Sequence, residues 1–476
     1  RRIPDPPVLG QVLAAEASLE LTADGDIPAA LERSYEAAQL GAANNDDNVV
    51  ATAFNNASFA LGSKLQKFDA ADVAYHAAQA AVARLGNPPR FVADLELFRA
   101  YALYRKGDFA GSLALQRTLL ALNTEIYGGD SYPVASTLSQ IGGSLAKLGR
   151  LGEARPLYAQ ALVIAERAIG PQHPSFGVLL QNAGGVARDA GDIAAASDML
   201  QRAVAIAARA TPDTPALAHA LDKLAGVRYE QRRLDDARGL LDQAIAIRLA
   251  KLGPGSPQLA ESYATLAAVF QLQGDPARAH QLYQQALAIE RKAYGEVHPH
   301  VGASFREDAG ALTALGRWPE AHAAIDRALA IDQQTIGDDN AEHGDTLTTQ
   351  GDLLCAEQHC AQAVALYRRA VALHEGELGA DSPVLIEPLV GLCTALLASG
   401  DAAGARELAA RAVRLAHQAP ADVLGAAQLC LARSEWETGD HDAARDHARA
   451  ARSAFAALAF PARARPVLDQ WLAAHP

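Results

Sequence analysis

The stretch Gln160-Ala161-Leu162-Val163-Ile164 returns six more times along the chain in nearly the same form. The later copies are Arg202-Ala203-Val204-Ala205-Ile206, Gln243-Ala244-Ile245-Ala246-Ile247, Gln285-Ala286-Leu287-Ala288-Ile289, Arg327-Ala328-Leu329-Ala330-Ile331, Arg369-Ala370-Val371-Ala372-Leu373 and Arg411-Ala412-Val413. Their first alanines lie 41 or 42 residues apart. A fixed period of this length predicts a stacked array of repeats in place of separate globular domains.

Each unit carries its own start and stop signals. Proline recurs where a helix is expected to begin, at Pro133, Pro174, Pro215, Pro257, Pro299 and Pro383. It is tolerated there because its missing N–H would have no partner within the helix. Glycine, which readily takes the left-handed conformation that ends a helix, recurs at Gly128, Gly170, Gly253, Gly295, Gly337 and Gly379.

A second break divides each unit into two helices, which we name helix A and helix B. It falls at Gly149, Gly191, Gly274, Gly316 and Gly400. Arg232 and Gln358 replace the glycine in two units. The apolar residues of helix A recur with the helical period, as in Leu259, Leu266 and Phe270.

This pattern resembles the tetratricopeptide repeat, whose motif is matched position by position at Ala267, Gly274, Ala279, Tyr283 and Ala286. The 42-residue spacing and the junction Tyr294-Gly295-Glu296-Val297-His298-Pro299 resemble the kinesin light chain type of this repeat. The resemblance implies an all-α, right-handed solenoid. It also implies that the A helices line a concave groove.

The repeat is regular only over residues 129–418. We expect residues 1–128 to form degenerate N-terminal repeats, the first over 8–44 with its turn at Gly25. We expect residues 419–476 to form a degenerate last repeat and a C-terminal capping helix. Irregular end repeats are typical because each must present one face to water. The prediction is about eleven helix-turn-helix repeats plus the capping helix.

Composition excludes some classes of partner. The 476 residues carry a formal net charge of −13, which argues against nucleic acid and against an anionic membrane surface. No apolar run approaches the roughly 20 residues of a membrane-spanning helix. The chain begins at Arg1 without an initiator methionine, so we expect a fragment of a longer protein. We expect a cytoplasmic location, or a periplasmic one if a membrane segment lies upstream.

The motifs of common enzymes are missing from the sequence, including phosphate loops, dinucleotide fingerprints and the zinc-protease motif. Four cysteines do not make a disulfide scaffold in a chain of this size. Cys355, His359 and Cys360 form the one cluster, which is open to a metal or redox reading and to a purely structural one. We favour the structural reading, because no second ligand pair is evident. The sequence predicts a non-enzymatic chain without a metal or other cofactor.

Candidate binding residues lie at the inward positions that the resemblance implies for helix A. Amide side chains, suited to hydrogen bonds with a peptide backbone, are Asn55, Asn56, Gln140, Gln181 and Asn182. The kinesin light chain family uses an asparagine at the position of Asn56 in this way. Aromatic anchor candidates are Phe59, Phe98, Tyr101 and Tyr104. Lys223 and Arg306 add cations. The same residues could instead only pack or solvate the repeats.

The leading hypothesis is a protein–protein interaction module that binds a peptide or partner domain in its concave groove. In arrangement the chain also resembles the C-terminal repeat region of certain bacterial Ser/Thr protein kinases. That resemblance implies a regulatory or substrate-recruiting role in a larger signalling protein. Two alternatives stay open: the sensor arm of an NTPase-type signalling protein, and a self-assembling scaffold that forms homodimers.

Overall fold

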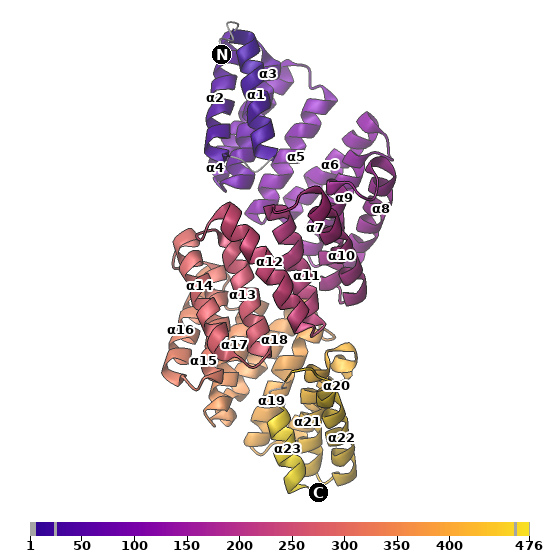
Figure 1. The fold of residues 1–476 in the computed structure, drawn as a ribbon, viewed down its shortest axis with the longest axis vertical. Coiled ribbons are helices and arrows are strands. Elements are labelled where there is room, and N and C mark those ends of the chain that lie inside the picture. The colour runs from indigo at the N-terminus through magenta and orange to yellow at the C-terminus, as the bar shows by residue number, and fades with distance from the viewer. Residues whose placement is uncertain (1–5, 23–25, 461–463, 476) are drawn as a thin grey trace. The chain divides into compact units, whose positions relative to one another are not determined.

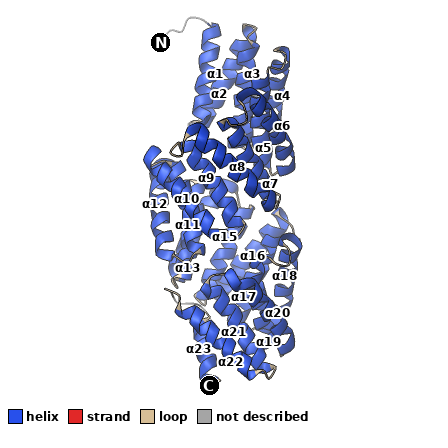
Figure 2. Cartoon of the chain, turned by 90° about the vertical axis from the view of Figure 1, so that its right-hand side faces the viewer, coloured by secondary structure: helices blue, strands red, loops and turns tan. Residues whose placement is uncertain are grey.

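The computed structural model describes residues 6–22, 26–460 and 464–475, and within these ranges it contains helices and no strand (Figure 2). Twenty-three α-helices follow one another, and successive helices pack in antiparallel pairs (Figure 1). The pairs are eleven, from α1 with α2 to α21 with α22, and α23 follows alone. The predicted all-α solenoid of about eleven repeats plus a C-terminal helix is therefore confirmed.

Contacts between residues divide the chain into two compact units, and the boundary in the sequence falls between Thr211 and Pro212. Unit 1 holds α1 (Pro6–Thr22), α2 (Ile27–Ala43), α3 (Asp47–Phe59), α4 (Phe68–Arg84), α5 (Pro89–Lys106), α6 (Phe109–Tyr127), α7 (Tyr132–Lys147), α8 (Leu151–Ile169), α9 (Pro174–Asp189) and α10 (Ile193–Ala210). The predicted turn at Gly25 lies outside the described residues.

Unit 2 holds the remaining six pairs and the last helix. They are α11 (Pro215–Glu230), α12 (Leu234–Leu252), α13 (Pro257–Leu272), α14 (Pro276–Tyr294), α15 (Pro299–Ala314), α16 (Trp318–Thr335), α17 (Ala341–Ala356), α18 (Val364–Leu378), α19 (Ile386–Ala398), α20 (Ala402–Leu415), α21 (Ala421–Glu437), α22 (His441–Ala456) and α23 (Arg465–Ala474). The division into 1–128, 129–418 and 419–476 rests on repeat regularity and stays a prediction. None of the described helices is long and apolar enough to cross a membrane.

The turn signals act as expected. Gly128 and Gly170 follow α6 and α8 with φ of 82° and 85°, in the left-handed region that favours glycine. Arg232 and Gln358 keep this conformation without being glycine, at φ of 59° and 67°. The A–B turn therefore imposes its shape even where the side chain disfavours it.

Small residues let helices A and B approach closely. Ala279 and Ala286, two turns apart on α14, are fully buried, and Tyr283 between them is 1% exposed. The same arrangement recurs around α18, where Ala363, directly before the helix, and Ala370 flank Tyr367. Helices A and B of a repeat therefore share a hydrophobic core. Every fully buried large side chain contributes about 1.5–3 kcal/mol to the free energy of unfolding.

The A helices form the inner side of each unit. In unit 1, α3 contacts both α1 and α5, and α7 contacts α9. In unit 2, each of α11, α13, α15, α17 and α19 contacts the next A helix. Neighbouring B helices in the described chain make few or no such contacts. The A helices therefore follow the tighter curve, as the resemblance implied.

All four cysteines are paired, which the sequence reading did not anticipate. Cys393 and Cys430 are buried and form a disulfide that joins α19 to α21. Cys355 and Cys360 form the second disulfide, across the turn after α17. Both sulfurs of the Cys-x-x-x-His-Cys cluster are thus bonded to each other and are not available as thiolate ligands.

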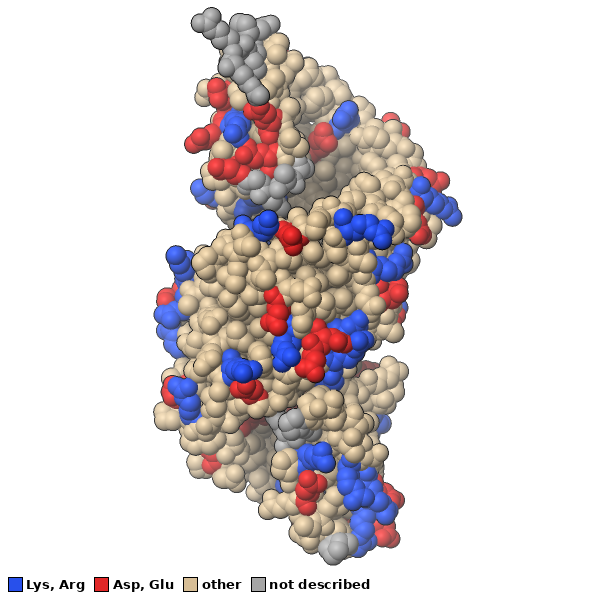
Figure 3. Space-filling model, in the orientation of Figure 1, with Lys and Arg blue, Asp and Glu red and all other residues tan. Residues whose placement is uncertain are grey.

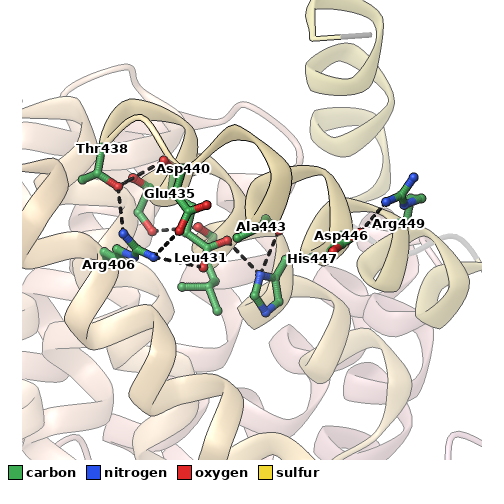
Figure 4. Close-up of polar contacts among 10 residues, drawn as sticks. Arg406, Leu431, Glu435, Thr438, Asp440, Ala443, Asp446, His447 and Arg449 are labelled. Carbon is green, nitrogen blue, oxygen red and sulfur yellow. Dashed lines mark hydrogen bonds and ion pairs between the residues drawn. The ribbon is translucent and has the colours of Figure 1, made fainter.

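A charged network fixes the last two repeats to each other (Figure 4). Arg406 of α20 donates to Asp440 at 2.8 Å, at the end of the turn after α21. Glu435 of α21, which is 4% exposed, lies 2.8 Å from the imidazole Nδ1 of His447 on α22. Arg406 also lies 3.8 Å from Glu435. The buried carboxylate therefore has charged or polar partners on both sides, as burial requires.

Candidate functional site

Aromatic side chains gather on the inner side of unit 1. The rings of Phe59 and Phe98 stack with their centroids 4.6 Å apart, and Tyr101 meets Phe59 edge-on at 6.0 Å. Phe98 and Tyr101 are three residues apart on α5 and so share one face. Tyr101 keeps 36% of its surface exposed. Three of the predicted anchors thus form one cluster that is partly open to solvent.

The fourth aromatic candidate lies one turn further along α5. Tyr104 packs edge-on against Phe109, with centroids 5.2 Å apart, and burial raises its pKa. Its hydroxyl is 4.0 Å from the position that a Cβ on Gly143 would occupy, so a larger residue there would contact it. Tyr104 therefore lies between the third and fourth repeats and is less available to a ligand than the other three aromatic candidates.

An irregular turn positions the aromatic cluster. A π-helical turn, Ala60–Lys64, extends α3 directly after Phe59, and π turns often occur at functional sites. Within it, a Cβ on Gly62 would lie 2.6 Å from the Cβ of Ala102. The close approach of α5 to this turn therefore requires glycine. Lys64 lies with its Nζ 5.4 Å from the centroid of the Phe59 ring.

A cavity of about 140 Å³ lies beside the aromatic cluster, between the A helices of the first three repeats. Its walls are Ser18 of α1, Ala51, Thr52, Asn55 and Asn56 of α3, Val82 of α4, and Phe91, Asp94, Leu95 and Phe98 of α5. The four lining residues of α5 share one face of that helix, because Phe91 and Phe98 each lie three or four positions from both Asp94 and Leu95. The cavity brings together Asn55, Asn56 and Phe98 from the predicted set. Sequence reasoning missed Asp94.

The predicted amides differ in their availability. Asn56 is 3% exposed and donates to the backbone carbonyl of Ala14 at 2.9 Å, so it links the first two repeats. Asn55 is 7% exposed, and its Oδ1 is buried without a hydrogen-bond partner. Gln140 donates to Ser136 at 3.3 Å, and its Oε1 is buried without a partner.

Two further amides are adjacent on α9 and point different ways. Gln181 is buried, at 7% exposure, whereas Asn182 is exposed. Asn182 is thus the predicted amide that a ligand could reach without displacing protein contacts.

Lys223 and Arg306 belong to unit 2 and are separate from this site. Arg306 of α15 is 3.1 Å from Glu307 and 3.6 Å from Asp345, and these carboxylates together raise its pKa against the effect of burial. Lys223 of α11 has a protein partner of its own. Its charge helps to lower the pKa of His219 to about 4, after the larger effect of desolvation.

The chain matches the sequence profile of the tetratricopeptide repeat over residues 133–209, 216–292 and 309–376. The matched segments are tetratricopeptide repeats. They cover repeats on both sides of the division between the units. The helix-pair architecture and the sequence match therefore agree on the fold of these segments. No curated protein matches the chain.

Two solved Rap proteins show the same fold, and part of the chain is similar in sequence to a third solved protein. The apo form of RapI shares 12% identity with this chain at a TM-score of 0.54, over 78% of this chain and 99% of RapI. The Rap conjugation gene regulator of plasmid pLS20, solved with the Phr* peptide, shares 13% identity at a TM-score of 0.50, over 78% and 96% of the two chains. A putative kinesin light chain of Podosopora anserina with TPR-like repeats shares 26% identity at a TM-score of 0.37, over 42% of this chain and 95% of that one.

Proposed function

We propose that the chain is a protein-interaction module and that the inner side of unit 1 binds a peptide or an extended segment of a partner protein. The observation that carries the proposal is the partly open cluster of Phe59, Phe98 and Tyr101 next to a cavity with an unpaired amide oxygen. Aromatic anchors flanked by polar groups are typical of binding hot spots. The Rap regulator solved with a bound peptide supports the choice of ligand class, since it shares the fold.

The site favours an extended segment over a folded domain. The cavity admits a single side chain, and the exposed Tyr101 lies beside the same stripe of α5. A peptide could place one side chain in the cavity and its neighbours against the aromatic rings. Asn182, which is exposed on α9, would serve the backbone of a peptide that extends as far as that helix.

A capture experiment with three chains tests the proposal. The parent chain, a Tyr101→Ala/Asn182→Ala variant and a Val73→Ala variant would each be used to capture partners from a lysate. Val73 is 73% exposed on α4, a B helix of the same unit, and is the matched surface control. We expect the parent and Val73→Ala to capture the same partner and the double variant to lose it. Equal capture by all three would reject the inner side of unit 1 as the site.

We also propose that the module serves a larger bacterial signalling protein, in a regulatory or substrate-recruiting role. The arrangement of regular and degenerate repeats supports a kinase partner domain, with an NTPase domain as the alternative. Sequencing the gene upstream of Arg1 separates them. Kinase motifs would support the first, a phosphate loop the second, and an open reading frame that encodes neither would contradict both.

The two disulfides bear on location. Disulfides persist in oxidising compartments and are rare in the cytosol. We therefore propose that the chain works in an oxidising compartment such as the periplasm, in place of the cytoplasmic location first expected. Mass spectrometry of the unreduced chain from its native source tests this, since four free thiols would contradict it.

A further inference from the structure

The cavity in unit 1 contains one hydrogen-bond acceptor without a donor. The Oδ1 of Asn55 is buried and, among the described residues, accepts no hydrogen bond. The side chain itself is held in place, because Asn55 is 7% exposed and lies within α3. Buried acceptors in native proteins are nearly always paired, so an unpaired one beside a cavity points to a ligand or to water.

A second acceptor reaches the same cavity from α5. Asp94 lines it, and no described cation lies within ion-pair distance of its carboxylate. The nearest charge that affects it is Arg90, one turn earlier on α5, which lowers the pKa of Asp94 by less than desolvation raises it. Asp94 is thus exposed to solvent, surrounding protein partly desolvates its carboxylate, and that carboxylate has no ion-pair partner among the described residues.

The rest of the lining is part apolar and part polar. Val82, Phe91, Leu95 and Phe98 provide apolar walls, Ser18, Thr52 and Asn56 add polar groups, and the volume is about 140 Å³. A cavity of about 150 Å³ holds a group the size of benzene. A side chain with an aliphatic stem and a donor at its tip therefore fits both the size and the chemistry of the site.

We propose that this cavity binds the ammonium or guanidinium group of a basic side chain on a peptide partner. The stem would lie against Phe91 and Phe98, and the head would donate to Asn55 Oδ1 and to Asp94. The charge of the surroundings favours a cation, since residues 6–106, which span the helices that line the cavity, contain twelve acidic and eight basic residues. Acidic side chains accordingly predominate on the N-terminal helices (Figure 3). This inference rests on the proposed function and specifies its ligand.

The first test uses small probes that do not depend on peptide binding. Saturation-transfer NMR with the full chain would compare Nα-acetyl-lysine methylamide with its norleucine analogue, which has the same stem and no charge. We expect transfer to the lysine probe only. Asp94→Asn should weaken its binding about tenfold, as expected for loss of a charge-assisted hydrogen bond. Asn55→Leu, which keeps the branching of the side chain but has no acceptor, should abolish it.

The control variant is Asp198→Asn, which removes an exposed carboxylate from α10, a B helix of the same unit. It should bind the lysine probe as the parent does. Circular dichroism would confirm that each variant remains folded, and the conservative Asp94→Asn keeps the test valid if Asn55→Leu does not fold. Equal transfer to both probes, or no response to Asp94→Asn, would overturn the proposal.

The second test selects binders from a phage library of random peptides against the full chain. Enrichment of Lys or Arg at one position, lost in a selection against Asp94→Asn, supports the proposal. Peptides that bind but show no basic preference would overturn it while leaving the peptide-binding function intact. A lysine probe that binds as expected without any peptide being enriched would retain the cavity assignment and count against the peptide-binding function. Failure of both tests rejects both.

Discussion

Arg232 and Asp422 form a bidentate ion pair across 190 residues of sequence. The guanidinium Nε lies 2.9 Å from Oδ1 and Nη2 lies 2.8 Å from Oδ2. Both side chains are largely buried, at 17% and 16% exposure. The pair joins the turn between α11 and α12 to the first turn of α21. Within unit 2, the first repeat thus contacts the last.

An apolar contact accompanies this pair. Phe460, in the segment after α22, packs on a core cluster that α11, α12 and α13 share and that includes Leu234, Leu241 and Leu266. Arg232 replaces the glycine of its turn and adopts an unfavourable left-handed conformation. Its ion pair with Asp422 is a specific contact that a glycine could not make. The gain from a charged hydrogen-bonded pair, about 1.5–3 kcal/mol, exceeds the cost of that conformation, about 1–2 kcal/mol.

Removing the pair should loosen both of its ends. We expect Asp422→Ala to speed amide hydrogen exchange in α21 and also in the turn around Arg232, 190 residues away. Asp236→Ala is the matched control. It removes a first-turn carboxylate whose partner, Arg233, is three residues away and exposed. Its effect should stay within α12 and cost less than about 0.5 kcal/mol. Faster exchange confined to α21 in Asp422→Ala would contradict the closure of unit 2.

The two disulfides should contribute unequally to stability. Cys393 and Cys430 close a loop with a sequence separation of 37, and Cys355 and Cys360 close one of 5. The chain-entropy relation then gives about 4 and about 2 kcal/mol. We expect Cys393→Ala/Cys430→Ala to lower the denaturation midpoint in urea more than Cys355→Ala/Cys360→Ala does. The difference between the parent and each double variant should shrink in reductant. The reverse order of stabilities would show that local packing outweighs loop closure.

His219 should remain neutral in the folded chain at pH values where an ordinary histidine is charged. Surrounding protein desolvates its ring although the residue is exposed, and the charges of Lys223 and Arg248 add to this, so its pKa is lowered to about 4. The unfolded chain binds the proton near pH 6.5 and the folded chain does not. The contribution of His219 to stability is therefore present above about pH 6.5 and lost as the pH falls through 4.

NMR titration of the His219 ring measures this directly. We expect a midpoint well below 6.5 in the parent and a higher one in Lys223→Met, which removes the charge of the cation with the larger effect on His219 while keeping its stem. His219→Gln should show a smaller loss of stability than the parent between pH 7 and pH 5. A midpoint near 6.5 in the parent would contradict the desolvated environment.

Phe98 should contribute more than Tyr101 to the free energy of unfolding. Phe98 stacks on Phe59 and lines the cavity, so Phe98→Ala should lower the free energy of unfolding by about 2 kcal/mol. Tyr101 keeps a third of its surface in water, and Tyr101→Ala should cost under about 1 kcal/mol. Urea denaturation of both variants checks this. A larger loss for Tyr101→Ala would make it unsuitable as a probe of binding.

The sequence predicts the fold well because each repeat contains the residues that set its own helix boundaries, turns and close packing. The prolines, the left-handed glycines and the paired alanines such as Ala279 and Ala286 are local signals, and repetition confirms each of them. The contact between Arg232 and Asp422 has no local signal, because it depends on how six repeats curve together. The pairing of Cys393 with Cys430 was missed although both residues lie on the A helices of neighbouring repeats, so repeat register was a usable signal there.

The candidate site was predicted only in part. Repeat register placed Asn55, Phe59, Phe98 and Tyr101 on the inner side, where the structure brings them together. Register could not show that Asn56 would bond to Ala14 while its neighbour Asn55 kept an unpaired oxygen. Asp94 was missed because it lies outside the inward positions that the resemblance implies for helix A. Its spacing of four residues from Phe98 on α5 was a usable signal.

The central claim is that the inner side of unit 1 contacts the partner, and site-specific photo-crosslinking tests it most directly. A photo-reactive phenylalanine would be placed at position 101 in one chain and at position 73 in another, and crosslinked products would be identified by mass spectrometry. We predict that position 101 crosslinks one partner segment containing a basic residue and that position 73 does not. Crosslinking of the partner from position 73 and not from position 101 would contradict the account.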